Sequence, residues 1–90
     1  MNNQRRKSLE ALKDKIDNLK GEIEALHGEL SQEHEDEQAA FDNLNEGLQQ
    51  AENGQKIEAA AENLDSALQN LDTAMSELDE AISYINTAVE

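Results

Sequence analysis

The sequence predicts an all-α fold, an antiparallel coiled-coil helical hairpin that forms one domain over residues 1–90. Two stretches carry apolar residues at alternating spacings of three and four, which is the pattern of a coiled-coil seam. The chain contains no proline, and no stretch alternates apolar and polar residues as a strand does. With 37% hydrophobic and 2% aromatic residues, a chain of 90 residues cannot bury a large globular core. We therefore expect two long helices that associate further, into a four-helix bundle.

The first helix is expected after a polar and basic start. Residues 1–7 are predicted to form a flexible basic leader, and Ser8 is a candidate N-cap. We place the helix at about 6–42. Its seam is regular over seven residues: Leu9, Leu12, Ile16, Leu19, Ile23, Leu26 and Leu30. Beyond the last of these the seam loses its phase, so we expect the end of this helix to pack less closely.

Two clusters of turn-forming residues, at 42–47 and 52–54, place the turn at about 43–49 and the second helix at about 50–89. The seam of the second helix is unbroken: Ile57, Ala61, Leu64, Leu68, Leu71, Met75, Leu78, Ile82, Ile85 and Val89. If Ala61 occupies position a of a heptad labelled a to g, Leu64 occupies d, and every g position is an alanine.

Pairing the two seams predicts a register. In an antiparallel pair each a residue lies opposite a d residue, and seven such layers form when Leu19 is set against Met75. This register centres the connection at Gly47. At the e positions it also opposes bases of the first helix to acids of the second: Lys13 to Asp79, Lys20 to Asp72 and His27 to Asp65. Exposed pairs of this kind contribute roughly a few tenths of a kcal/mol each, so they select the register more than they stabilise it.

The segment 35–64, about a third of the chain, combines an aromatic residue with a polar stretch ahead of the second seam: Phe41, Asp42, Asn43 and Leu44, then Glu46, Leu48, Gln49, Gln50 and Gly54. In these residues the chain resembles small acidic helical-hairpin proteins of uncharacterised function from bacterial and prophage genomes. The resemblance implies a turn at the same place and an origin in a mobile element, and it implies no activity. Such sequences often carry proline where this chain has Asn45.

The charge of the chain is −14 and is unevenly distributed. The first twenty residues carry six of the seven basic residues and a net charge of +3, whereas the remaining seventy carry −17. Most of the molecule is therefore expected to repel nucleic acid and anionic membranes and to prefer a basic protein partner. No apolar run approaches the roughly 20 residues of a membrane span, and no secretory signal is visible, so we expect a cytoplasmic protein.

No residue pattern predicts catalysis, a cofactor or a metal. The sequence lacks cysteine, a glycine-rich phosphate loop and a nucleophile placed beside a base, so we expect a protein that is not an enzyme. Glu24 and His27 have the spacing of ligands in di-iron helical bundles, where both side chains face the bundle interior. Here Glu24 falls at b and His27 at e, off the seam, and no second pair of this kind exists.

The most distinctive candidate surface is the alanine column, which we define as the g positions of the second helix: Ala60, Ala67, Ala74, Ala81 and Ala88. Apolar residues at a, d and g form a face wider than a two-helix seam requires, and small residues let another helix approach closely. The column is therefore predicted to mediate self-association into a homodimer, or to hold a partner helix in a groove. The alternative is that alanine serves only as a strong helix former beside the seam.

A second candidate surface is the acidic patch, which we define as six carboxylates near the turn: Glu33, Glu35, Asp36, Glu37, Asp42 and Glu46. Together these surfaces predict a protein-protein interaction module that acts through helix contacts and an acidic surface. The alternative is an inhibitor from a phage or mobile element that imitates nucleic acid and blocks a DNA-binding defence enzyme, in the manner of an anti-CRISPR protein. Eighteen acids on a rod of about 50 Å come within about a factor of two of the charge density of duplex DNA. An acidic face that serves only solubility is the simpler explanation.

Overall fold

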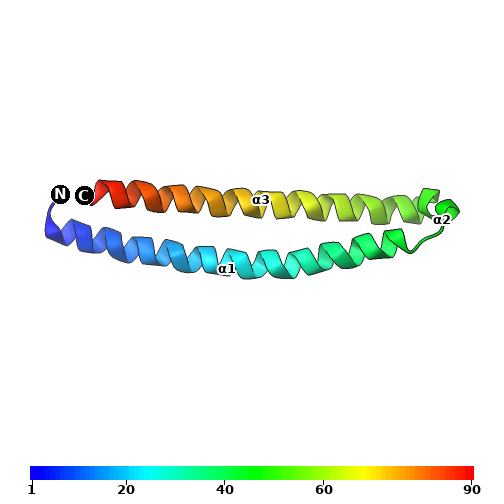
Figure 1. Cartoon of the computed structure of the whole chain (residues 1–90), viewed down its shortest axis with the longest axis horizontal. Helices are drawn as coiled ribbons and strands as arrows, with labels where there is room; N and C mark the ends of the chain where they lie inside the picture. Colours follow the sequence, from blue (N-terminus) through cyan, green and yellow to red (C-terminus); the bar gives the residue numbers. More distant parts are fainter.

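The computed structural model, which describes residues 1–90, is a rod of two antiparallel helices joined at one end (Figure 1). Helix α1 spans Asn3–Asp42, the short helix α2 spans Glu46–Gln50, and helix α3 spans Glu52–Ala88. The rod is 68 Å long and 16 by 13 Å in cross-section. Both termini lie at one end of the rod and α2 lies at the other (Figure 1). The all-α class and the two long helices are as predicted from the sequence.

Helix α1 begins earlier than predicted, because Asn2 and not Ser8 is its N-cap. The side chain of Asn2 accepts a hydrogen bond from the backbone N–H of Arg5 at 2.8 Å, which satisfies one of the free donors of the first turn. Arg6 then donates from Nε to the carbonyl oxygen of Val89, 2.9 Å away across the hairpin. The residues predicted as a flexible leader are therefore helical from Asn3 onward.

The connection between the long helices contains a helix of its own. Asn45 caps α2 by accepting the backbone N–H of Leu48 at 2.9 Å, and α2 packs against the start of α3. Gly54, in the first turn of α3, is buried at this contact. The turn predicted at 43–49 is thus replaced by a longer connection, and the second helix begins at Glu52 and not at residue 50.

The predicted register is wrong by one heptad. The side chain of Lys20 contacts Asp79 and that of His27 contacts Asp72, whereas the seams predicted Asp72 and Asp65. Leu30 and Leu71 line the same hollow, although the predicted register set Leu30 against Leu64. The physical reason is α2: its extra turn lengthens the connection and moves its centre from Gly47 to residues 50–51.

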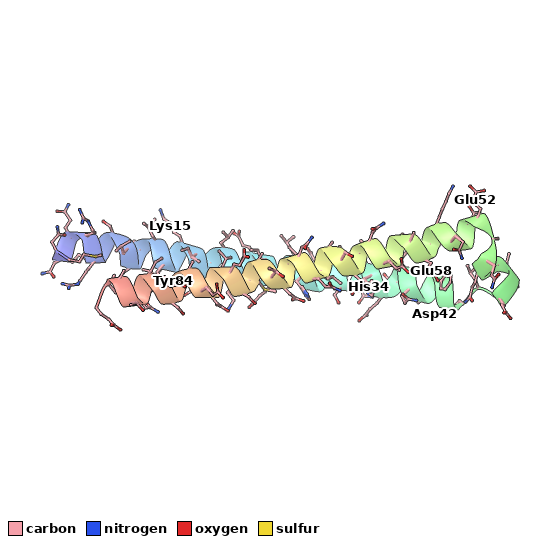
Figure 2. The ribbon with its side chains drawn as sticks, turned by 90° about the horizontal axis from the view of Figure 1, so that it is seen from above. Lys15, His34, Asp42, Glu52, Glu58 and Tyr84 are labelled. Atoms are coloured by element: carbon pink, nitrogen blue, oxygen red, sulfur yellow. The ribbon has the colours of Figure 1, made fainter.

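The interior of the rod is thin. Seen from above, the two long helices cross near the middle of the rod (Figure 2). Only Gly54, Ala61 and Leu68 are buried, and most other seam residues remain half-buried. A hairpin with so small a core leaves most of its apolar seam in partial contact with solvent.

Candidate interaction surface

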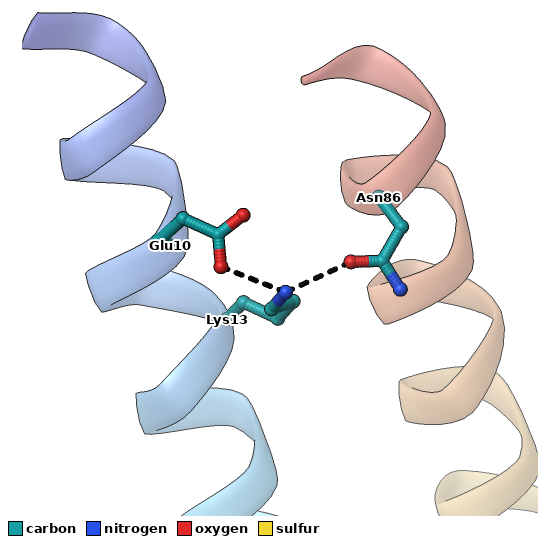
Figure 3. Close-up of polar contacts among 3 residues, drawn as sticks. All are labelled: Glu10, Lys13 and Asn86. Carbon is teal, nitrogen blue, oxygen red and sulfur yellow. Dashed lines mark hydrogen bonds and ion pairs between the residues drawn. The ribbon is translucent and has the colours of Figure 1, made fainter. Parts of the chain in front are cut away.

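One edge of the hairpin is polar. At heptad position e, Lys20 Nζ lies 2.7 Å from Asp79 Oδ1 and His27 Nε2 lies 3.1 Å from Asp72 Oδ1. One heptad closer to the termini, Lys13 donates to Asn86 Oδ1 at 2.9 Å and also contacts Glu10 at 2.8 Å (Figure 3). These contacts, spaced seven residues apart on both helices, form what we name the polar edge.

The hydrogen bonds of the polar edge stabilise the charged form of two lysines. The bond to Asp79 raises the pKa of Lys20, and the bond to Glu10 raises the pKa of Lys13. In both cases partial desolvation opposes the shift and nearby carboxylates add to it. Both ammonium groups therefore remain protonated throughout the neutral range.

The opposite edge of α1 exposes three leucines. The exposed fraction is 49% for Leu12, 47% for Leu19 and 55% for Leu26, although each occupies a d position that a two-helix seam would cover. Positions d and e lie on opposite sides of position a around a helix. The e positions of α1 are half-buried while these d positions are exposed, so α1 is rotated with its e side toward α3. We name Leu12, Leu19 and Leu26 the leucine row.

The alanine column lies beside the leucine row. In an antiparallel pair the g positions flank the edge opposite the e positions, so the column is on the same side of the hairpin as the exposed leucines. In the observed register, each exposed leucine of α1 lies at the same height along the rod as one alanine of α3: Leu12 with Ala88, Leu19 with Ala81 and Leu26 with Ala74. Ala74 and Ala81 are half-buried, and Ala88 is exposed. These six residues are the apolar face, which extends from the terminal end to the middle of the rod.

Two alanines of the column, Ala60 and Ala67, lie in the half of the rod nearer the turn and are half-buried. The sequence reasoning identified the alanines but missed the leucine row, because it placed every d residue inside the seam. No sequence signal distinguishes these exposed d positions from covered ones, because bases at e positions also pair with acids across a seam whose d positions are covered.

The apolar face continues into an open hollow of about 650 Å³. Its apolar wall is formed by Leu26, Leu30 and Leu71, and its rim by Glu29, Gln32 and Glu33. Glu33 occupies the d position that follows Leu26, where the leucine row ends. The hollow therefore lies at the boundary between the apolar face and the acidic part of α1.

The acidic patch lies at the turn end of the rod, where Figure 2 shows Asp42. Its members are exposed apart from Glu37, which is half-buried, and none of them forms an ion pair. Lys56, the only nearby base in sequence, contacts Glu52 at 3.4 Å. Residues 26–75, which form the turn half of the rod, carry twelve acids and one base, for a net charge of −11. The terminal half carries nine acids and six bases, for a net charge of −3.

No three side chains of histidine, cysteine, aspartate or glutamate are grouped so as to hold a metal ion. His27, the residue with metal-ligand spacing to Glu24, instead contacts Asp72. None of the three helices combines the length and the apolar composition that crossing a membrane requires. In comparisons with known proteins, the chain matches no family model, no curated protein and no solved structure.

Proposed function

We propose that this protein is a non-enzymatic interaction module that acts through helix-to-helix contacts, and that two hairpins associate through the apolar face into a four-helix bundle. The observation that carries the proposal is the leucine row, whose three side chains are about half exposed in one line along α1. Contiguous exposed apolar surface of this kind marks interaction sites in soluble proteins. The neighbouring alanines would let the helices of a second hairpin approach closely.

The energetics of a single hairpin support the same conclusion. Ordering a residue costs about 1.5 kcal/mol of conformational entropy, which burial of apolar surface must offset. In this chain only two apolar side chains, Ala61 and Leu68, are buried within one hairpin. A second hairpin packed on the apolar face would bury the leucine row and supply apolar burial that the monomer lacks.

The proposal is tested by the dimer dissociation constant of Leu19→Lys, compared with that of Ser83→Lys. Leu19 is at the centre of the leucine row, whereas Ser83 is exposed at a b position, on the side of α3 away from the alanine column. A lysine at position 19 would place a charge inside the interface, so we expect the mass to fall from twice 10.0 kDa toward 10.0 kDa. Ser83→Lys should keep the wild-type mass. Equal effects of the two substitutions would argue against the apolar face as the interface.

A second candidate function is the binding of a basic protein in place of nucleic acid. It is favoured by the net charge of −11 in the turn half of the rod and by the absence of ion pairs within the acidic patch. Such a surface would speed association with a basic groove and lose this advantage above physiological salt.

The second candidate is tested with the triple variant Glu35→Lys, Asp36→Lys and Glu37→Lys. It should retain its helix content in circular dichroism and bind a basic host partner at least tenfold more weakly. If the triple variant binds that partner as tightly as wild type while changes at Ala67 and Ala74 abolish binding, the partner recognises helices and not charge.

A further inference from the structure

One row of side chains on α1 is complementary to a second copy of the same row that runs in the opposite direction. The leucine row is extended at both ends by exposed d positions, so that the complete row consists of five residues: Arg5, Leu12, Leu19, Leu26 and Glu33. Its centre is Leu19, its neighbours on both sides are leucines, and its ends carry opposite charges. Reading the row backwards therefore exchanges a base for an acid and leaves the apolar centre unchanged.

From this symmetry we infer that the second hairpin of the proposed dimer binds antiparallel to the first, with the two-fold axis passing beside Leu19. The axis sets Leu19 against its own copy, Leu12 against Leu26 of the second copy, and Arg5 against Glu33 of the second copy. Every level of the row then pairs leucine with leucine or base with acid. This inference rests on the proposed self-association and specifies its geometry.

The flanking g positions of α1 follow the same symmetry. Lys15 precedes Leu19 by four residues and Glu22 follows it by three. The two-fold rotation therefore brings Lys15 of each copy close to Glu22 of the other. Along the rod the two residues are offset by one residue, about 1.5 Å. Both side chains are exposed in the single hairpin and available for this contact.

The hollow beside Leu26 receives the basic end of the second copy in this arrangement. Arg5 comes level with Glu33, which lies on the rim of the hollow, while Leu30 and Leu71 form its apolar wall. An arginine can lay its aliphatic stem on such a wall while its guanidinium binds the carboxylate at the rim. The hollow thus offers an apolar wall and a carboxylate to the basic first turn of α1.

The charge of the two halves also favours the antiparallel orientation. A parallel dimer would set the leucine row against the alanine column, and it would bring the two turn halves, each of charge −11, side by side. The antiparallel dimer overlaps about 50 Å of each rod, residues 1–35 and 65–90 with a net charge of −8, and directs the turn segments 36–64, each of charge −6, in opposite directions. Leu19 lies about 25 Å from the terminal end, at about 1.5 Å per helical residue from Asn3. The antiparallel assembly would therefore be about 90 Å long, against about 70 Å for the parallel one, from the 68 Å length of one rod.

A charge exchange across the axis tests the inference. Arg5→Glu and Glu33→Arg each convert two attractive pairs of the dimer into two repulsive ones, so each should raise the dissociation constant about tenfold. The double variant restores both pairs and should bind within about twofold of wild type. Arg5→Glu adds an acid to the first turn of α1, where it favours the helix, so weakened association cannot reflect loss of that helix.

The matched controls carry the same charge changes on the outer surface. Lys7→Glu and Glu35→Arg change f positions two residues from Arg5 and Glu33, and each should alter the dissociation constant less than the corresponding change in the row. If the double variant is as weak as the sum of its single changes, the antiparallel axis is wrong.

Disulfide formation supplies the second readout, since the chain has no native cysteine. Leu19→Cys should form a disulfide between two copies under mild oxidation, and Ser83→Cys, at a b position on the outer surface, should not. Dimers in which Leu19→Cys crosslinks only to Ala81→Cys of the other copy would establish the parallel orientation, overturning this inference and leaving the proposed function intact. A wild-type chain that stays monomeric would overturn both.

Discussion

The ammonium of Lys20 lies 2.7 Å from the carboxylate of Asp79, one heptad further along α3 than the apolar seams predict. A second contact has the same offset: His27 contacts Asp72, the residue that the sequence predicted beside Lys20. The two contacts together fix the register of the hairpin. In the same structure α1 is rotated with its e side toward α3, and its d positions Leu12, Leu19 and Leu26 are about half exposed.

The register predicts which cysteine pairs crosslink within one chain. Ile23 and Leu78 occupy one layer in the observed register, whereas the sequence alone would pair Ile23 with Leu71. The two candidates differ by seven residues, about 10 Å along the helix, which is beyond the reach of a disulfide. Ile23→Cys with Leu78→Cys should therefore oxidise within the monomer, as read by mass spectrometry. Preferential oxidation of Ile23→Cys with Leu71→Cys would restore the register predicted from the sequence.

The polar edge predicts a loss of stability at alkaline pH. The folded state raises the pKa of both Lys13 and Lys20 above the ordinary 10.5, so their contribution is fully present below the pKa of the unfolded chain. This contribution fades as the pH rises through the folded pKa. The double variant Lys13→Arg and Lys20→Arg stays charged at these pH values and should lose less stability between about pH 9 and about pH 12. Urea unfolding across this range measures the difference, and identical pH profiles would exclude the contribution.

Gly54 and the two glycines of α1 should respond oppositely to alanine. A methyl group at Gly54 would lie 2.6 Å from the carbonyl oxygen of Gln49 and closer still to that of Leu48, so Gly54→Ala must displace α2 or the start of α3. At Gly21 and Gly28 nothing lies within 4 Å of the added carbon, and alanine there should stabilise the helix by up to about 1 kcal/mol. Thermal unfolding should rank Gly54→Ala below wild type and both control variants above it. Stabilisation by Gly54→Ala would contradict the close packing of α2 on α3.

The alanine column predicts that a single charge at its centre prevents association. Ala74 is half-buried and level with Leu26, so the carboxylate of Ala74→Glu would be enclosed by a second hairpin without a basic partner. Ser76→Glu adds the same charge two residues away at an exposed b position and serves as the control. Analytical gel filtration should shift Ala74→Glu toward monomer or show it unfolded, and leave Ser76→Glu at the wild-type volume. If Ala74→Glu elutes folded at the wild-type volume, the column lies outside the interface.

The helices were predictable from the sequence, and the register was not. The apolar spacing identified both long helices because period and phase persist over many turns. The same repetition made the register ambiguous. When α3 is shifted by seven residues along α1, apolar residues again lie opposite apolar residues, and Asp79 replaces Asp72 beside Lys20. Only the connection distinguishes the two registers, and it depends on the cap at Asn45 and the missing side chain of Gly54.

The candidate surface was predictable only in part, for a related reason. The alanines stand out as a column in the sequence, but the exposure of Leu12, Leu19 and Leu26 depends on how far α1 is rotated about its axis. The structure combines that rotation with contacts of Lys13, Lys20 and His27 to α3. A heptad pattern assigns each residue to a face of its helix, but it does not determine how far that face is turned toward the partner helix.

Self-association through the apolar face is the central claim, and sedimentation equilibrium of the unmodified chain tests it most directly. Across micromolar concentrations at physiological salt, the fitted mass should approach twice the chain mass of 10.0 kDa and fall on dilution along a monomer-dimer curve. A fitted mass of 10.0 kDa across the whole range, with the helix content intact, would contradict the claim.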